Sequence, residues 1–103
     1  MNNFQLYKNN SEMNRDYIYL LDVQSALLND LKTRLVIPLI KRPIKNMVIS
    51  ILNPEIVIKD ATYIILTQQM AAVPLNYLGD LVSDAQIDRT NILSAIDFLI
   101  TGY

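Results

Sequence analysis

The residues that could carry out chemistry in this chain are few. Its 103 residues include no histidine and no cysteine, the side chains that supply most acid–base catalysis and most zinc ligands. Any catalysis would have to use arginine, lysine, tyrosine or carboxylates. Lys32 with Arg34, and the corner formed by Lys41, Arg42 and Lys45, could bind phosphate. Neither group has the glycine or aromatic neighbours of a phosphate or nucleotide site, so we favour solvated loops.

A second candidate is acidic. Asp80, Asp84 and Asp88 are spaced by four residues, and helical residues four apart share a face. Such carboxylates could bind a metal ion. Complementation of a helix dipole also explains acidic residues near a helix start, and we favour it, with no metal or other cofactor expected.

Tyrosines form a third candidate. Tyr17 and Tyr19 are expected on one face of a strand, with Tyr7 paired across from them. This arrangement would make a stacking platform for bases or ordinary cross-strand packing, and we favour packing.

Two further segments have no assigned role from pattern alone. Leu27, Leu28 and Leu31 follow a predicted strand, and buried anchors or a protruding apolar contact explain them equally well. The end of the chain, Thr101-Gly102-Tyr103, is typical of a helix terminus with glycine as its C-cap.

Composition limits the kind of fold that can position these residues. The chain is 51% hydrophobic with a formal net charge of −1. It therefore predicts one domain, residues 1–103, with a real core and no disulfide framework. Disorder and a nucleic-acid-coating surface are disfavoured. Residues 1–10 lack the apolar core of a signal peptide. The uncharged stretch 61–79 predicts buried strands and a turn rather than a membrane span, so we expect a cytoplasmic protein.

The hydropathy pattern predicts strands through most of the chain. Residues 4–7 and 17–23 are expected to form a hairpin, and residues 34–39 a third strand. Pro38 lacks an N–H donor, so that strand is expected to lie at a sheet edge or to bend. Residues 56–58 and 62–67 predict a second hairpin around Lys59-Asp60, and residues 73–75 a short extended piece.

From Ser83 the pattern becomes helical. Ser83 with Gln86 predicts a capping box, and Gly102 is expected to end the helix. Apolar residues follow helical spacing on one face and continue round two further sides, at Ile92, Leu93, Ala95, Ile96, Phe98, Leu99 and Ile100. One sheet face cannot cover so broad an apolar surface, so the helix is expected either to be sunk in the core or to meet a partner chain, and we favour the partner. The chain therefore predicts six or seven short strands followed by one helix.

Four blocks, in order along the chain, resemble the CcdB family of plasmid and chromosomal toxins. They are Asp22-Val23-Gln24-Ser25, Arg34-Leu35-Val36-Ile37-Pro38-Leu39, Met70-Ala71-Ala72-Val73-Pro74 and Ala95-Ile96-Asp97-Phe98-Leu99-Ile100-Thr101-Gly102, and Phe4 and Tyr7 fit the opening strand. The resemblance implies a mainly β fold, an SH3-like antiparallel barrel with a small second sheet and a C-terminal helix. It also implies a homodimer with these helices near the twofold axis.

The resemblance implies a type II toxin that binds the A subunit of DNA gyrase, traps the cleaved gyrase–DNA complex and is not an enzyme. A CcdA-like antitoxin would neutralise it through a disordered segment. The family's gyrase-facing positions fall on Leu27, Leu28, Asp97, Thr101, Gly102 and Tyr103. The dimer interface is assigned to Ile96, Leu99 and Ile100, and antitoxin contacts to Tyr7, Tyr17 and Tyr63. Neither direct sequence-specific nucleic-acid binding nor membrane binding is expected.

This chain departs from the family at the gyrase-facing tip. The best-known family pattern there is Trp-Gly-Ile, of which only Gly102 is kept, and Asp97 stands where the family has an amide. A tryptophan could stack on a gyrase arginine, whereas Thr101 cannot. Two alternatives follow. One is RNA cleavage by a MazF- or Kid-like toxin of the same fold, disfavoured by four arginines and no histidine. The other is a diverged protein, inactive on gyrase, that acts with its antitoxin as a co-repressor.

Overall fold

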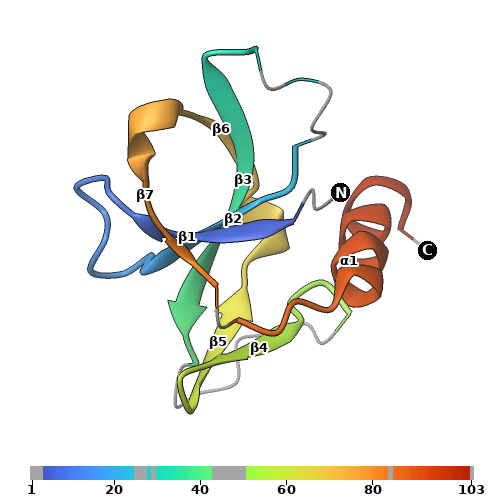
Figure 1. Cartoon of the computed structure of the whole chain (residues 1–103). Coiled ribbons are helices and arrows are strands. Elements are labelled where there is room, and N and C mark those ends of the chain that lie inside the picture. The colour runs from blue at the N-terminus through green and yellow to red at the C-terminus, as the bar shows by residue number, and fades with distance from the viewer. Residues whose placement is uncertain (1–3, 25–27, 29, 43–50, 84, 103) are drawn as a thin grey trace.

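The computed structural model describes residues 4–24, 28, 30–42, 51–83 and 85–102. Within them lie seven strands and one α-helix (Figure 1). The elements, in chain order, are β1 (Gln5–Asn9), β2 (Tyr19–Asp22), β3 (Thr33–Lys41), β4 (Glu55–Ile58), β5 (Ala61–Ile65), η2 (Thr67–Gln69), β6 (Ala71–Pro74), η3 (Leu75–Tyr77), β7 (Leu78–Val82) and α1 (Arg89–Thr101). The prediction of a mainly β chain with a C-terminal helix is therefore confirmed.

The strands form one open antiparallel sheet. Its order is β4-β5-β3-β2-β1-β7, and β6 pairs with β3 beside this path. Figure 1 shows β6, η3 and β7 curving round to the side of β1, as in a partly closed barrel. The separate small second sheet that the resemblance implied is not formed by the described strands. The β4–β5 hairpin joins the main sheet because Leu39 and Ile40 of β3 pair with Ile65 and Ile64 of β5.

Pro38 lies where β3 changes partner. Residues 33–36 of β3 pair with β6, and residues 39–41 pair with β5. On its other side β3 pairs with β2, where Pro38 faces Leu20. Of the two alternatives expected for this strand, the position at a sheet edge is therefore wrong. A proline is tolerated in this interior strand because it occupies the gap between two partners, where no ladder hydrogen bond from its nitrogen is needed.

Both predicted hairpins are confirmed. β1 pairs with β2, and β4 pairs with β5. The turn of the second hairpin is Lys59-Asp60, whose φ angles of 49° and 68° are both left-handed. Positive φ at both central residues defines the turn whose twist matches that of the flanking strands. The stretch 61–79 folds as β5 through the start of β7. Among the described residues, none of the helices has the length and hydrophobicity that crossing a membrane requires.

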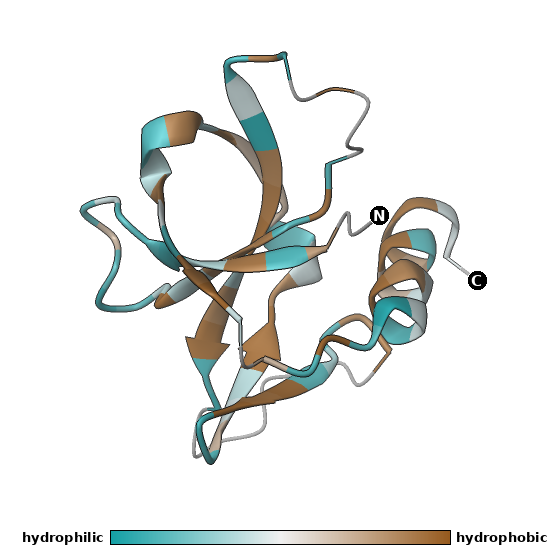
Figure 2. Cartoon of the chain, in the orientation of Figure 1, coloured by the Kyte–Doolittle hydropathy of each residue, from teal (hydrophilic) through white to brown (hydrophobic). Residues whose placement is uncertain are grey.

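The core is formed where the sheet meets α1. Its buried members come from β1, β2, β3, β4, β5, β7 and α1, and are Leu6, Leu21, Ile37, Leu39, Ile56, Ile58, Ile65, Val82 and Ile92. Figure 2 shows mostly hydrophobic residues where β3, β4 and β5 come together. Burial of these aliphatic side chains is the main stabilising contribution, at about 25 cal/mol per Å² of apolar surface.

The helix begins later than the sequence predicted. It starts at Arg89 with Asp88 as N-cap, so the capping box at Ser83 and Gln86 is wrong. Its end is confirmed, because Gly102 has φ 78° and its N–H donates to the carbonyl of Phe98. Figure 1 shows α1 beside the start of β1, in agreement with the Arg89 guanidinium lying 5.4 Å from the centre of the Phe4 ring.

Candidate functional site

The C-terminal end of α1 is an exposed tip held by two backbone acceptors. The Gly102 N–H donates to the Phe98 carbonyl at 2.9 Å, and the Thr101 hydroxyl donates to the Asp97 carbonyl at 2.7 Å. Asp97, Thr101 and Gly102 are all exposed. The structure thus brings together three of the six predicted gyrase-facing residues. Tyr103 lies outside the described residues.

The same helix carries more apolar surface than the sheet covers. Ile92 and Ala95 are buried, and Ile96 packs partly against the core. Leu93, Leu99 and Ile100 are exposed, and Ile100 retains 71% of its accessible surface. The predicted dimer residues Ile96, Leu99 and Ile100 therefore run from the core contact of α1 to its open side.

The loop after β2 presents a second apolar contact. Leu28 and Leu31 each retain 48% of their accessible surface, and Leu27 lies outside the described residues. The Leu28 carbonyl accepts hydrogen bonds from the Gln24 side chain at 3.0 Å and from the Leu31 N–H at 3.2 Å. Of the two explanations left open for these leucines, the structure favours protruding contacts over buried anchors at positions 28 and 31.

Within the described residues, the two arginines of the basic groups are each paired with a carboxylate. Arg34 is buried and donates from Nε and Nη2 to Asp22 Oδ2, at 3.1 and 2.6 Å. Arg42 forms an exposed ion pair with Glu55 at 2.6 Å. Lys45 lies outside the described residues. Arg34 is therefore an internal structural residue, which its position beside Lys32 in the sequence did not reveal.

The tyrosines also pair differently from the prediction. Tyr17 precedes β2, and Tyr7 faces Leu20 rather than another tyrosine. Tyr19 instead meets Tyr63 edge to face, with ring centres 5.1 Å apart. This geometry is favourable packing between aromatic rings, whereas the stacking platform of Tyr7, Tyr17 and Tyr19 is not formed. Tyr7 donates its hydroxyl to Gln5 Oε1 at 2.9 Å.

The acidic series does not make a described metal site. Asp88 caps α1 by accepting from the Asn91 N–H at 3.2 Å, and Asp84 lies outside the described residues. Within the part of the chain that the structure describes, no three or more carboxylates gather closely enough to hold a metal ion.

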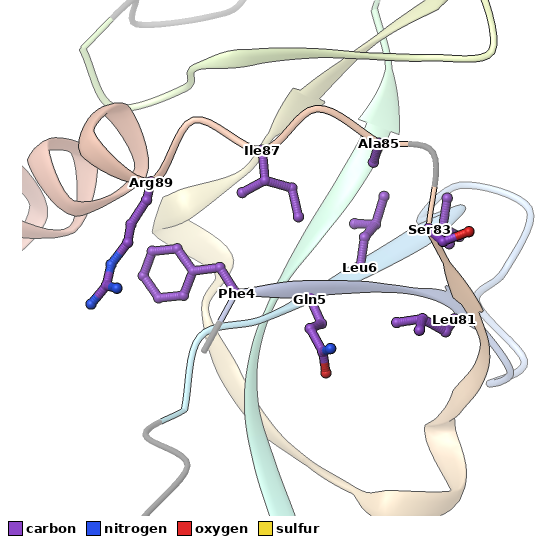
Figure 3. A pocket seen from close by; sticks show the side chains of 9 residues that line it. Phe4, Gln5, Leu6, Leu81, Ser83, Ala85, Ile87 and Arg89 are labelled. Carbon is purple, nitrogen blue, oxygen red and sulfur yellow. The ribbon is translucent and has the colours of Figure 1, made fainter. Parts of the chain in front are cut away.

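A groove that the sequence did not reveal lies between β1, β7 and the segment leading to α1. It has a volume of about 390 Å³. Figure 3 shows the Leu6, Ala85 and Ile87 side chains along it, with Arg89 beside Phe4 at one end. Phe4 and Arg89 are 85 positions apart, so only knowledge of the fold could have found this feature.

One sheet of seven antiparallel strands with a single C-terminal helix is an architecture consistent with the CcdB-like fold. The family model described as CcdB protein matches residues 3–102. The chain therefore belongs to the CcdB family, whose members are toxins of toxin–antitoxin systems.

Proposed function

We propose that this protein binds the A subunit of DNA gyrase and traps the gyrase–DNA cleavage complex. The observation that carries the proposal is the exposure of Leu28, Asp97, Thr101 and Gly102. These are the described residues at the positions that the family resemblance assigns to gyrase. Leu28, Thr101 and Gly102 each take part in a hydrogen bond that holds the local backbone, so they can contact a partner with little reorganisation of the toxin.

The protein acts by binding and not by catalysis. The arginine that the sequence offered for phosphate contact, Arg34, is held by Asp22, and Arg42 is held by Glu55. These pairings argue against RNA cleavage of the MazF or Kid type, which would need positioned cationic and acid–base groups facing the substrate.

The functional unit is a homodimer formed through α1. Leu99 and Ile100 are exposed apolar residues, and Ile96 lies between them and the core. Joining two copies through these residues would remove apolar surface from water. It would also place two Thr101-Gly102 tips close to one axis, so that a single gyrase segment could contact both.

A CcdA-like antitoxin neutralises the toxin. Tyr7, Tyr17 and Tyr63 remain the candidate contacts, and all three are half-buried. A tyrosine that keeps part of its ring and its hydroxyl accessible suits recognition of a disordered segment, because it offers large contact area with few rotatable bonds.

A cleavage-complex assay tests the gyrase proposal. Purified protein is mixed with gyrase, supercoiled plasmid and ATP, and linear DNA is measured after denaturant and protease. The wild-type protein should produce linear DNA. Gly102→Glu should not, because it places a charged side chain on the exposed tip, in a left-handed conformation that favours glycine.

Thr90→Glu is the matched control, because it adds the same side chain at an exposed position in the first turn of α1. It should retain full activity, since a negative charge near a helix N-terminus is favourable. Absence of linear DNA with a folded wild-type protein would reject the proposal for the gyrase tested. The same preparation is then assayed on gyrase of the host species and on RNA.

A further inference from the structure

A buried polar network joins the sheet to the loop that carries Leu28. Asp22 ends β2 and Arg34 lies near the start of β3. Nε and Nη2 of Arg34 donate to Asp22 Oδ2, while Asp22 Oδ1 accepts from the Gln24 N–H at 3.0 Å. The Arg34 and Asp22 side chains retain only 11% and 4% of their accessible surface. Both carboxylate oxygens of Asp22 are therefore hydrogen-bonded, Oδ2 to the Arg34 side chain and Oδ1 to the Gln24 backbone.

Gln24 extends the network to Leu28. Its side-chain Oε1 accepts from the Leu35 N–H of β3 at 3.0 Å. Its Nε2 donates to the Leu28 carbonyl at 3.0 Å. Gln24 is itself buried, so both bonds are partly shielded from competing water. The Gln24 side chain thus links Leu35 of β3 to the backbone of Leu28, whose own side chain is exposed.

Stability alone does not account for this arrangement. The attraction within a buried ion pair offsets the desolvation of the two charges only with good geometry, and apolar replacements are often as stable. Leu28 and Leu31 are exposed and contribute little to the core, so core packing does not fix their positions. Hydrogen bonds to the Leu28 carbonyl can hold this part of the backbone while leaving both side chains exposed.

We propose that Asp22, Arg34 and Gln24 are positioning residues that hold the backbone of Leu28 in place for partner binding. The inference rests on the proposed function, since gyrase is the partner concerned. Arg34 holds the Asp22 carboxylate, Asp22 holds the Gln24 N–H, and the Gln24 side chain in turn holds the Leu28 carbonyl.

Two substitutions at Gln24 separate its two bonds. Gln24→Glu keeps an acceptor for the Leu35 N–H but replaces the donor facing the Leu28 carbonyl with a second acceptor. Gln24→Met removes both bonds at similar volume. Amide hydrogen exchange at Leu31, which donates to the same carbonyl, should accelerate at least tenfold in both variants. Exchange at Leu35 should accelerate only in Gln24→Met.

Binding to the purified A subunit of gyrase is measured on the same proteins. Gln24→Glu and Leu28→Ala should each weaken binding about tenfold or more. Their combination should weaken it no further than either alone, because contacting groups in one network are not additive. Ile58→Val, a buried change in β4, controls for lost stability and should leave affinity unchanged.

The outcomes distinguish the two proposals. Unchanged exchange at Leu31, or additive losses in the double variant, would overturn the positioning network. If the variants exchange faster at Leu31 but the wild-type protein does not bind gyrase, the network still holds the Leu28 backbone and the proposed partner is rejected. If Ile58→Val weakens binding as much as Gln24→Glu does, the loss in both variants comes from lowered stability, and Gln24 is a purely structural residue.

Discussion

Asp88 Oδ1 accepts a hydrogen bond from the Asn91 N–H at 3.2 Å and so fixes the start of α1. Asp88 also places a negative charge at the positive end of the helix dipole. Asp88→Ala should lower the free energy of unfolding by about 1 kcal/mol. Urea denaturation measures this difference, and Asp88→Ser should restore most of it. An unchanged midpoint for Asp88→Ala would show that packing of Ile92 alone determines where α1 begins.

The predicted start of the helix at Ser83 was wrong, and the physical reason lies in the segment that precedes α1. Ser83 and Gln86 have the spacing of a capping box, yet residues 85–88 belong to no helix and the Asp88 backbone is extended. Ala85 and Ile87 are half-buried and pack against the core, while Gln86 and Asp88 are exposed. This alternation has the period of a strand. Burial of Ala85 and Ile87 therefore outweighs the local capping signal, which sequence pattern alone cannot weigh.

Local signals predicted the hairpins and the helix end correctly. Lys59-Asp60 and Gly102 act within a few residues, so their positions in the sequence were sufficient. The Asp22–Arg34 pair was not predicted because it depends on β2 and β3 lying side by side. The same holds for Tyr19 and Tyr63, which meet only through the order β2-β3-β5. At the candidate site, the exposed tip of α1 was predictable, whereas the network supporting Leu28 was not.

The Lys59-Asp60 turn is a place where stability can be increased. Both residues have positive φ, which costs about 1 kcal/mol or more for side chains other than glycine or asparagine. The pair Lys59→Asn and Asp60→Gly supplies the sequence preferred in this turn. We expect the free energy of unfolding to rise by about 1 kcal/mol in urea denaturation, because the strain of positive φ is relieved. Lys59→Gln with Asp60→Ser removes the same two charges without supplying the residues that favour positive φ, and should give no comparable gain.

Thr67 offers a second stabilising change. Its side chain is fully buried in η2, and Oγ1 has no hydrogen-bond partner within the described structure. An unsatisfied buried hydroxyl costs about 1 kcal/mol or more, and Thr67→Val replaces it with a methyl group of similar size. Thermal unfolding should therefore shift to higher temperature. Thr67→Ala also leaves a small cavity and should not share the gain. A lower midpoint for Thr67→Val would mean that the hydroxyl is satisfied in solution.

The proposed dimer predicts the behaviour of Ile100. Its side chain retains 71% of its accessible surface and belongs to the outer side of α1, so it adds little to the stability of one chain. Ile100→Asp should therefore leave the circular dichroism spectrum unchanged while abolishing self-association, because a charge in an apolar interface is desolvated without a partner. Sedimentation equilibrium should give twice the chain mass of 11.8 kDa for the wild type and a single chain mass for the variant.

Unfolding should report the same association. The wild-type midpoint should rise with protein concentration, because binding between folded chains stabilises them by mass action. The midpoint of Ile100→Asp should not depend on concentration. Thr90→Asp, an equally charged change in the first turn of α1, should behave as the wild type. A wild-type protein that stays at the mass of one chain throughout the concentration range would place gyrase binding on a single copy, with each tip acting alone.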